Sequence, residues 1–160
     1  MQIRRAVEKD KDAVWEIIKS VIAGGDTYVF DPETPREEMI DYWFASEKYV
    51  YVADDNGEIL GTFWIKANQP GLGDHVANAA YMVSPKAHGR GIGRKLGEYS
   101  IEEAKRLGFT AMQFNFVVSS NTTAVNLWQS LGFEIIGTIP KAFRHLSLGQ
   151  TDAHVMYRSL

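Results

Sequence analysis

The sequence predicts an α+β protein whose central sheet is mixed and mostly antiparallel. Aromatic and β-branched runs of strand length alternate with segments of helical periodicity in the order βααβββαβαββ. A composition of 45% hydrophobic and 12% aromatic residues supplies a packed core. The length suits one domain over residues 1–160, and we find no repeat, linker or low-complexity tract.

The first strand and the first two helices are predicted from local signals. Residues 3–6 have the length and composition of a short strand. Asp10 or Asp12 can cap the helix that follows, because a carboxylate oxygen there accepts a hydrogen bond from an amide of the first turn, and Gly24-Gly25 ends that helix. Thr34-Pro35-Arg36-Glu37 has the spacing of a capping box with proline at the first helical position. We expect a second helix from there to about residue 46.

Two antiparallel neighbours and a further strand come next. Residues 49–53 and 59–67 are rich in aromatic and β-branched side chains, and Asp54-Asp55-Asn56-Gly57 between them is a strong hairpin signal. Residues 68–74 form a loop rich in proline and glycine. Residues 76–83 are then expected to form a strand that leads directly into a glycine-rich loop.

Helices and strands alternate in the second half of the chain. Gly108 supplies the left-handed residue that ends the helix after the glycine-rich loop. Residues 111–117 form a strand, and Asn121 can cap the short helix that follows. Residues 133–139 and 153–158 are the last two strands.

The composition excludes several classes of function. A net charge of −3 argues against broad nucleic-acid binding, which requires a basic face. The absence of cysteine excludes disulfides, thiolate metal sites and a cysteine nucleophile. No stretch approaches the roughly 18 apolar residues of a membrane span, and residues 1–6 lack the apolar core of a secretion signal. We expect a cytoplasmic protein that binds neither nucleic acid nor a membrane.

A glycine-rich run with a basic cluster precedes the third helix. Gly89, Gly91 and Gly93 stand among four basic residues, which are Lys86, Arg90, Arg94 and Lys95. Glycines let bare backbone approach a ligand, and the amides of a helix N-terminus attract anions. The run is not a P-loop, because no Lys-Ser/Thr pair follows its last glycine, and it lacks the third glycine of a dinucleotide fingerprint. It predicts a site for a different phosphate-bearing ligand.

Two motifs resemble those of one enzyme family. His88-Gly89-Arg90-Gly91-Ile92-Gly93 resembles the acetyl-coenzyme A loop Gln/Arg-x-x-Gly-x-Gly/Ala of the GNAT acetyltransferase superfamily, with His88 as the one departure. The segment from Asn121 to Phe133 resembles the distal motif Asn-x-x-Ala-x-x-x-Tyr-x-x-x-Gly-Phe, with Trp128 in place of the tyrosine. The resemblance spans nearly the whole chain. It implies the GNAT fold, with α/β/α layers and a sheet splayed between its fourth and fifth strands.

The resemblance implies an N-acetyltransferase that uses acetyl-CoA and no metal. An amine attacks the thioester directly, while backbone near Met82 and Val83 holds the pantetheine arm and the loop amides hold the pyrophosphate. The implied cofactor-binding residues are Met82, Val83, His88, Gly89, Arg90, Gly91, Ile92, Gly93, Arg94, Asn121 and Trp128. The indole of Trp128 cannot act as the acid that the family's tyrosine supplies to the leaving thiolate. The leaving thiolate is then protonated by another route, or a hydrogen-bond donor such as Asn121 stabilises it until water protonates it.

Three asparagines suggest the acceptor site. Asn78 and Asn115 lie inside predicted strands, where amides are unfavourable without a reason, and Asn121 follows the second of these strands. Their segments resemble the yeast proline-analogue N-acetyltransferase branch, which acetylates azetidine-2-carboxylate and related imino acids. That resemblance implies that Asn78 and Asn115 bind the acceptor while Asn121 serves coenzyme A or its thioester, so Asn115 and Asn121 are the expected catalytic residues. The two strand asparagines could also simply bond to each other. Tyr28 and Phe30 are expected to contribute to acceptor binding.

The base and the acceptor class stay open at this point. Residues 76–83 contain no glutamate, where many relatives place a general base, so amine deprotonation is expected through water, with His75 and His154 as possible bases. A phosphinothricin-type or a peptide N-acetyltransferase is an alternative to an enzyme of small-molecule amines and imino acids. The missing tyrosine also allows a non-catalytic acyl-CoA-binding module. A homodimer is common in the family, and aromatic residues near Phe143 could serve it.

Overall fold

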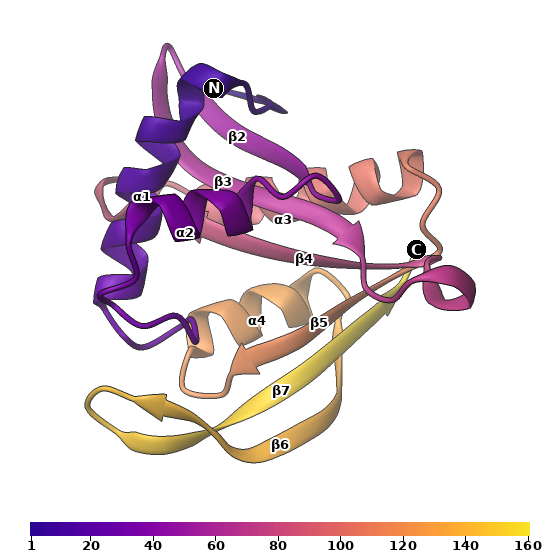
Figure 1. Ribbon diagram of the computed structural model, residues 1–160. Coiled ribbons are helices and arrows are strands. Elements are labelled where there is room, and N and C mark those ends of the chain that lie inside the picture. Colours follow the sequence, from indigo (N-terminus) through magenta and orange to yellow (C-terminus); the bar gives the residue numbers. More distant parts are fainter.

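The computed structural model describes residues 1–160 and contains one seven-stranded sheet with the strand order β1-β2-β3-β4-β5-β7-β6 (Figure 1). The strands are β1 (Gln2–Arg5), β2 (Tyr49–Asp55), β3 (Glu58–Ala67), β4 (Val76–Val83), β5 (Ala111–Val118), β6 (Glu134–His145) and β7 (Gly149–Ser159). The helices are α1 (Lys11–Ala23), α2 (Arg36–Trp43), α3 (Ile92–Arg106) and α4 (Thr122–Ser130). The order βααβββαβαββ is the predicted one, and the α+β class with a mixed, mostly antiparallel sheet is confirmed.

The sheet divides between β4 and β5, which are its one parallel pair. The two strands pair only at Val76–Ala111 and Ala77–Met112. Beyond these residues they diverge, and Figure 1 shows the space between them widening along β4. The predicted splay is confirmed. It leaves one edge of β4 without a partner strand after Ala77.

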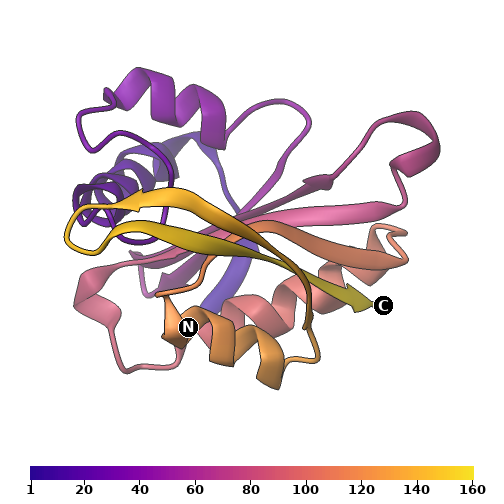
Figure 2. The ribbon, with the colours of Figure 1, turned by 90° about the horizontal axis from the view of Figure 1, so that it is seen from below.

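Helices cover both faces of the sheet. On one face α1 and α2 pack against β2 to β4 through a core that includes Ile18, Trp43 and Trp64. On the other face α3 and α4 bury a second core that includes Leu96 and Trp128. Figure 2 shows the β6–β7 hairpin crossing the molecule toward the end of α1. Its tip lies against the loop between α1 and α2, where the Leu146 amide donates to the Gly25 carbonyl at 3.1 Å.

Local signals located most turns and helix ends correctly. Asn56 and Gly57 have φ angles of 54° and 93°, as the predicted hairpin turn requires. Gly108, with a φ of 96°, follows α3. The Asn121 side chain caps α4 by accepting a hydrogen bond from the Ala124 amide at 3.3 Å.

Several predictions at element ends were wrong. The capping box at α2 does not form, because the Thr34 hydroxyl donates to the Asp31 carbonyl at 2.6 Å instead, and the helix ends at Trp43. The last two strands are longer than the predicted ranges 133–139 and 153–158 and meet in a hairpin at residues 146–148. Most of β6 is exposed, so its sequence has no alternation of buried apolar and exposed polar residues that would show where the strand ends. Phe143, expected near an exposed aromatic surface, is buried.

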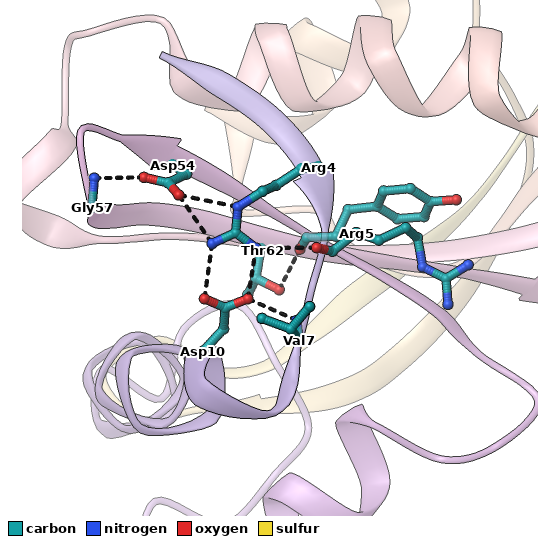
Figure 3. A network of polar contacts seen from close by, with 8 residues as sticks. Arg4, Arg5, Val7, Asp10, Asp54, Gly57 and Thr62 are labelled. Carbon is teal, nitrogen blue, oxygen red and sulfur yellow. Dashed lines mark hydrogen bonds and ion pairs between the residues drawn. The ribbon is translucent and has the colours of Figure 1, made fainter.

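Asp10 stands at the N-cap position of α1 without capping it. Both of its carboxylate oxygens accept hydrogen bonds from Arg4, at 2.8 and 2.9 Å, and one also accepts from the Val7 amide at 2.8 Å. The Arg4 Nε donates to Asp54 at 3.0 Å, and Asp54 accepts from the Gly57 amide (Figure 3). Asp10 is only 4% exposed, and the Arg4 guanidinium lowers its pKa. The network joins β1, α1 and the β2–β3 hairpin.

None of the helices has both the length and the apolar surface needed to traverse a lipid bilayer. No group of three or more histidine, aspartate or glutamate side chains is arranged to hold a metal ion.

Candidate active site

The free edge of β4 directs backbone groups into the split between β4 and β5. The Ser84 amide donates to the Leu60 carbonyl on β3 at 2.8 Å. Because hydrogen-bonded residues alternate along an antiparallel ladder, Met82 then also belongs to the β3 ladder. The backbone N–H and C=O groups of Tyr81 and Val83 therefore point away from β3 and into the split. Of the two residues expected to hold a pantetheine arm, only Val83 is placed to do so with its backbone, which corrects the expectation for Met82.

The glycine-rich loop leads from a short turn after β4 into α3. Gly89 and Gly91 have φ angles of 76° and 73°, and a Cβ atom added at either would meet nothing within 4 Å. Gly91 is the N-cap of α3, so the first amides of this 15-residue helix, including those of Ile92 and Gly93, have no acceptor within the helix. His88 is exposed beside them. An open backbone surface at a helix N-terminus fits a phosphate group.

Two arginines flank this loop and already have partners. Arg90 pairs with Asp55 at 3.0 Å, and Arg94 donates to the Ser130 hydroxyl at 2.8 Å. The run from Lys86 to Lys95 contains no acid, but the fold brings Asp55 to it from the β2–β3 hairpin. Both arginine side chains are about half exposed, and exposed ion pairs are weak. Either can therefore turn toward a phosphate at small cost.

A cavity of about 360 Å³ lies at the split and reaches the face covered by α1 and α2. It brings together the six predicted side chains Tyr28, Phe30, Asn78, Asn115, Asn121 and Trp128. Nineteen residues line it, fifteen of them hydrophobic and none of them charged. The cavity thus joins the predicted acceptor residues to the distal-motif residues in one space.

The three asparagines occupy different positions in this cavity. Asn78 accepts a hydrogen bond from the Ala79 amide at 2.8 Å, which satisfies one N–H of the free β4 edge. Asn121 caps α4. Asn115 is exposed, donates to Asn68 at 2.7 Å and accepts from Gln113 at 3.0 Å. Asn78 and Asn115 therefore do not bond to each other, and each keeps part of its hydrogen-bonding capacity for a ligand.

Tyr28 reaches from the loop between α1 and α2 to the free edge of β4. Its hydroxyl accepts from the Tyr81 amide at 3.0 Å and donates to the Tyr81 carbonyl. Burial raises the pKa of this phenol above its ordinary value. A phenol with a raised pKa is a poor acid but a good hydrogen-bond donor, so Tyr28 does not replace the family's acidic tyrosine.

Trp128 packs deep in the wall of the cavity. It is 7% exposed, and its ring centroid lies 4.6 Å from that of Tyr81 and 4.8 Å from that of Phe114. Gly97 on α3 makes room for it, since a Cβ there would lie 2.9 Å from the indole. Trp128 thus forms part of the cavity wall from α4.

Neither histidine proposed as a base lines the cavity. His75 is exposed at the start of β4, at the far end from the glycine loop. His154 on β7 exchanges a hydrogen bond with Thr138 at 2.9 Å. Neither histidine is therefore close enough to the cavity to accept a proton directly from an amine bound there.

Comparison with known proteins now gives the family. The model of the acetyltransferase (GNAT) family matches residues 15–133. The chain belongs to the GNAT family. Acetyl-CoA is the cosubstrate of this family, and the chain is accordingly an N-acetyltransferase.

Two curated relatives of this GNAT protein cover most of its length. N-acetyltransferase aca1 of Schizosaccharomyces pombe is 32% identical in an alignment of 148 positions that covers 82% of this chain and 71% of that protein. An L-methionine sulfoximine/L-methionine sulfone acetyltransferase of Salmonella typhimurium is 28% identical over 146 residues, covering 88% of this chain and 84% of the relative.

Solved GNAT structures superpose on nearly the whole fold. A GCN5-related N-acetyltransferase from Kribbella flavida has a TM-score of 0.95 and 44% identity, covering 99% of this chain and 97% of that one. The putative acetyltransferase yncA from Salmonella typhimurium, solved with acetyl-CoA, has a TM-score of 0.87 and 25% identity, covering 100% and 94%.

Sequence reasoning missed part of the cavity wall. Tyr42, Trp43 and Trp64 also line it, and Tyr81 contributes both its backbone and its ring. In the sequence, these aromatic residues look like ordinary core positions of a helix and two strands. No local signal separates a core aromatic residue from one that borders a cavity.

Proposed function

We propose that this GNAT protein acetylates the nitrogen of a small-molecule amine or imino acid, with cyclic imino acids such as azetidine-2-carboxylate as the first acceptors to test. The cavity beside the free β4 edge carries this proposal. Its volume of about 360 Å³ suits a small acceptor together with the acetyl end of the cofactor. Its lining has no carboxylate to bind a polycation.

Acetyl-CoA supplies the acetyl group. The amine nitrogen forms a bond to the thioester carbonyl carbon, the carbon–sulfur bond breaks, and coenzyme A leaves as a thiolate while the amine proton passes to water. The open amides around Gly91 would hold the pyrophosphate, and Val83 would bind the pantetheine arm. Asn121 and Trp128 both line the cavity, and their side-chain N–H groups would donate hydrogen bonds to the thiolate.

One relative and two side chains of the cavity support a small acceptor. The Salmonella typhimurium relative is named for the acetylation of two small amino acid derivatives, and this chain covers most of its length. Asn78 and Asn115 at the cavity suit a small zwitterion, because neutral amides can donate to a carboxylate and accept from an amine.

The proposal is tested by measuring thiol release from acetyl-CoA with a panel of amines. The panel contains azetidine-2-carboxylate, cis-4-hydroxyproline, phosphinothricin, L-methionine sulfoximine, polyamines and short peptides, and a reaction without acceptor is the control. Turnover of the small acceptors supports the proposal. Turnover confined to peptides or polyamines overturns it, and binding of acetyl-CoA without any turnover would instead indicate a non-catalytic module.

A further inference from the structure

Two lysines and one indole N–H lie next to one wall of the cavity and have no anionic partner. The indole nitrogen of Trp64, a cavity residue that is 2% exposed, has no hydrogen-bond partner in the protein. Lys48 is 7% exposed, and Lys66 is half-buried. The ion pairs of the structure include neither lysine. A buried cation without a counter-charge is unfavourable, so an anionic ligand is the natural complement of the two lysines.

The strand register places Lys66 beside the cavity. Trp64 pairs with Ala80 and Lys66 pairs with Asn78 across the β3–β4 ladder. Residues two apart on a strand share a face, and directly opposed side chains are neighbours. Since Trp64, Ala80 and Asn78 all line the cavity, Lys66 leaves the sheet at the cavity edge, next to Asn78.

Lys48 lies behind the same wall. Its ammonium group is 4.5 Å from the ring centroid of Trp64 and 3.3 Å from that of Tyr42, and it donates to the Tyr42 carbonyl. Both rings line the cavity. Burial, helped by the charge of Lys66, lowers the pKa of Lys48 to about 8. The two ammonium groups therefore act on one another and on the same part of the cavity.

We propose that Lys66, at the edge of the cavity, binds the carboxylate of the acceptor, with the charge of Lys48 behind the Trp64 ring adding to the attraction. The proposal rests on the proposed function and narrows it to amino and imino acids. Lys66 and Asn78 hold the carboxylate at the cavity edge, while Lys48 adds positive charge through the aromatic wall. The same charges disfavour a protonated amine, so they favour the neutral form that attacks the thioester.

Pairs of acceptors that differ only in the carboxylate test this inference. Azetidine-2-carboxylate is compared with azetidine, L-proline with pyrrolidine, and L-phenylalanine with phenethylamine, each at saturating acetyl-CoA. The enzymes are the parent and the variants Lys66→Met, Lys66→Arg and Lys48→Met. Lys105→Met is the matched control, because Lys105 is a surface residue of α3 that pairs with Glu102.

We expect the parent to prefer the acid of each pair. Lys66→Met should lower kcat/KM for the acids by at least about tenfold through KM, the size expected for losing a charged hydrogen bond. The kcat/KM for the amines and the KM of acetyl-CoA should change less than about twofold, or about 0.4 kcal/mol. Lys66→Arg should retain the preference, and Lys105→Met should match the parent. Lys48→Met should also lower kcat/KM for the acids.

Other outcomes separate this inference from the proposed function. The carboxylate site is overturned if the parent enzyme prefers the amines. It is also overturned if Lys66→Met lowers kcat/KM equally for the acid and the amine of each pair. Both results leave the small-molecule function in place. No turnover of any of the six compounds, with peptides accepted, overturns both.

Discussion

The hydroxyl of Tyr28 hydrogen-bonds to both backbone groups of Tyr81, accepting from its amide at 3.0 Å and donating to its carbonyl. Tyr81 lies on β4 beyond the last residue that pairs with β5. A side chain from a loop 53 residues away thus replaces the missing strand at this position. A ligand that lies along the free edge of β4 must compete with Tyr28 for these groups.

Tyr28→Phe is expected to weaken the ligand-free fold and to tighten acetyl-CoA binding. The variant loses two hydrogen bonds, which should lower the free energy of unfolding by about 1–2 kcal/mol. Acetyl-CoA no longer has to displace the hydroxyl, so its Kd should fall severalfold. Urea denaturation and calorimetry measure the two effects.

Tyr49→Phe is the control for Tyr28→Phe, because Tyr49 lies on β2 away from the cavity. It should leave both quantities unchanged. Weaker acetyl-CoA binding in Tyr28→Phe would contradict the competition and show that the phenol contacts the bound cofactor.

Gly91→Ala tests the phosphate site. A Cβ at a φ of 73° costs about 1–2 kcal/mol of backbone strain, although it meets no neighbour. We expect the amides of the first α3 turn to shift, so that acetyl-CoA binding weakens by at least about tenfold, or about 1.4 kcal/mol. Gly108→Ala carries the same strain at the other end of α3, also in open space. Equal affinities in calorimetry for the two variants would refute the site.

Trp128→Tyr asks whether the family's acid can be restored. The smaller ring leaves space against Tyr81 and Gly97, so the unfolding free energy should fall by about 1–2 kcal/mol. We expect kcat to be unchanged or higher, because the phenol can protonate the thiolate. Trp128→Phe leaves nearly the same space without the hydroxyl. A kcat that falls equally in both variants would show that the indole has a role of its own.

The sequence predicted the features that depend on short segments. The glycine loop, the Asn121 cap and the Asn56-Gly57 turn follow from residues within one or two turns of each other, where the chemistry of one side chain decides the backbone. Two spaced motifs were enough to give the GNAT fold and, with it, the splay of β4 from β5.

The features that escaped prediction depend on distant partners. Asp10 could have capped α1, but Arg4 and the Val7 amide hold its carboxylate. The bond between Tyr28 and Tyr81 joins a loop to a strand that no pattern relates. Lys48 reads as a surface residue and becomes buried only when Tyr42 and Trp64 surround it.

Asn115→Ala is expected to impair use of the acceptor and not of the cofactor. Asn115 is exposed and joins Asn68 to Gln113, so its loss should cost about 1 kcal/mol, or about fivefold in the acceptor kcat/KM. The KM of acetyl-CoA should stay the same. Gln113→Ala breaks the same chain of amides from a residue outside the cavity. If both variants behave alike in steady-state kinetics, Asn115 stabilises the structure of β5 and does not contact the acceptor.

The pair of Asp10 and Arg4 makes the stability of the fold depend on pH. Arg4 lowers the pKa of Asp10 in the folded state, whereas the unfolded chain has a pKa near 3.9. The pair therefore contributes its full stability at neutral pH, and the contribution is lost as the pH falls below about 4 toward the folded-state pKa. Asp10→Asn should lower the unfolding free energy by about 1–3 kcal/mol at pH 7, and the difference from the parent should shrink toward pH 3. Urea denaturation at pH 7, 5, 4 and 3 measures it, with Asp12→Asn, an exposed pair with Arg36, as a control that should change little. A difference that stays constant over this range would show that Asp10 acts through packing and not through its charge.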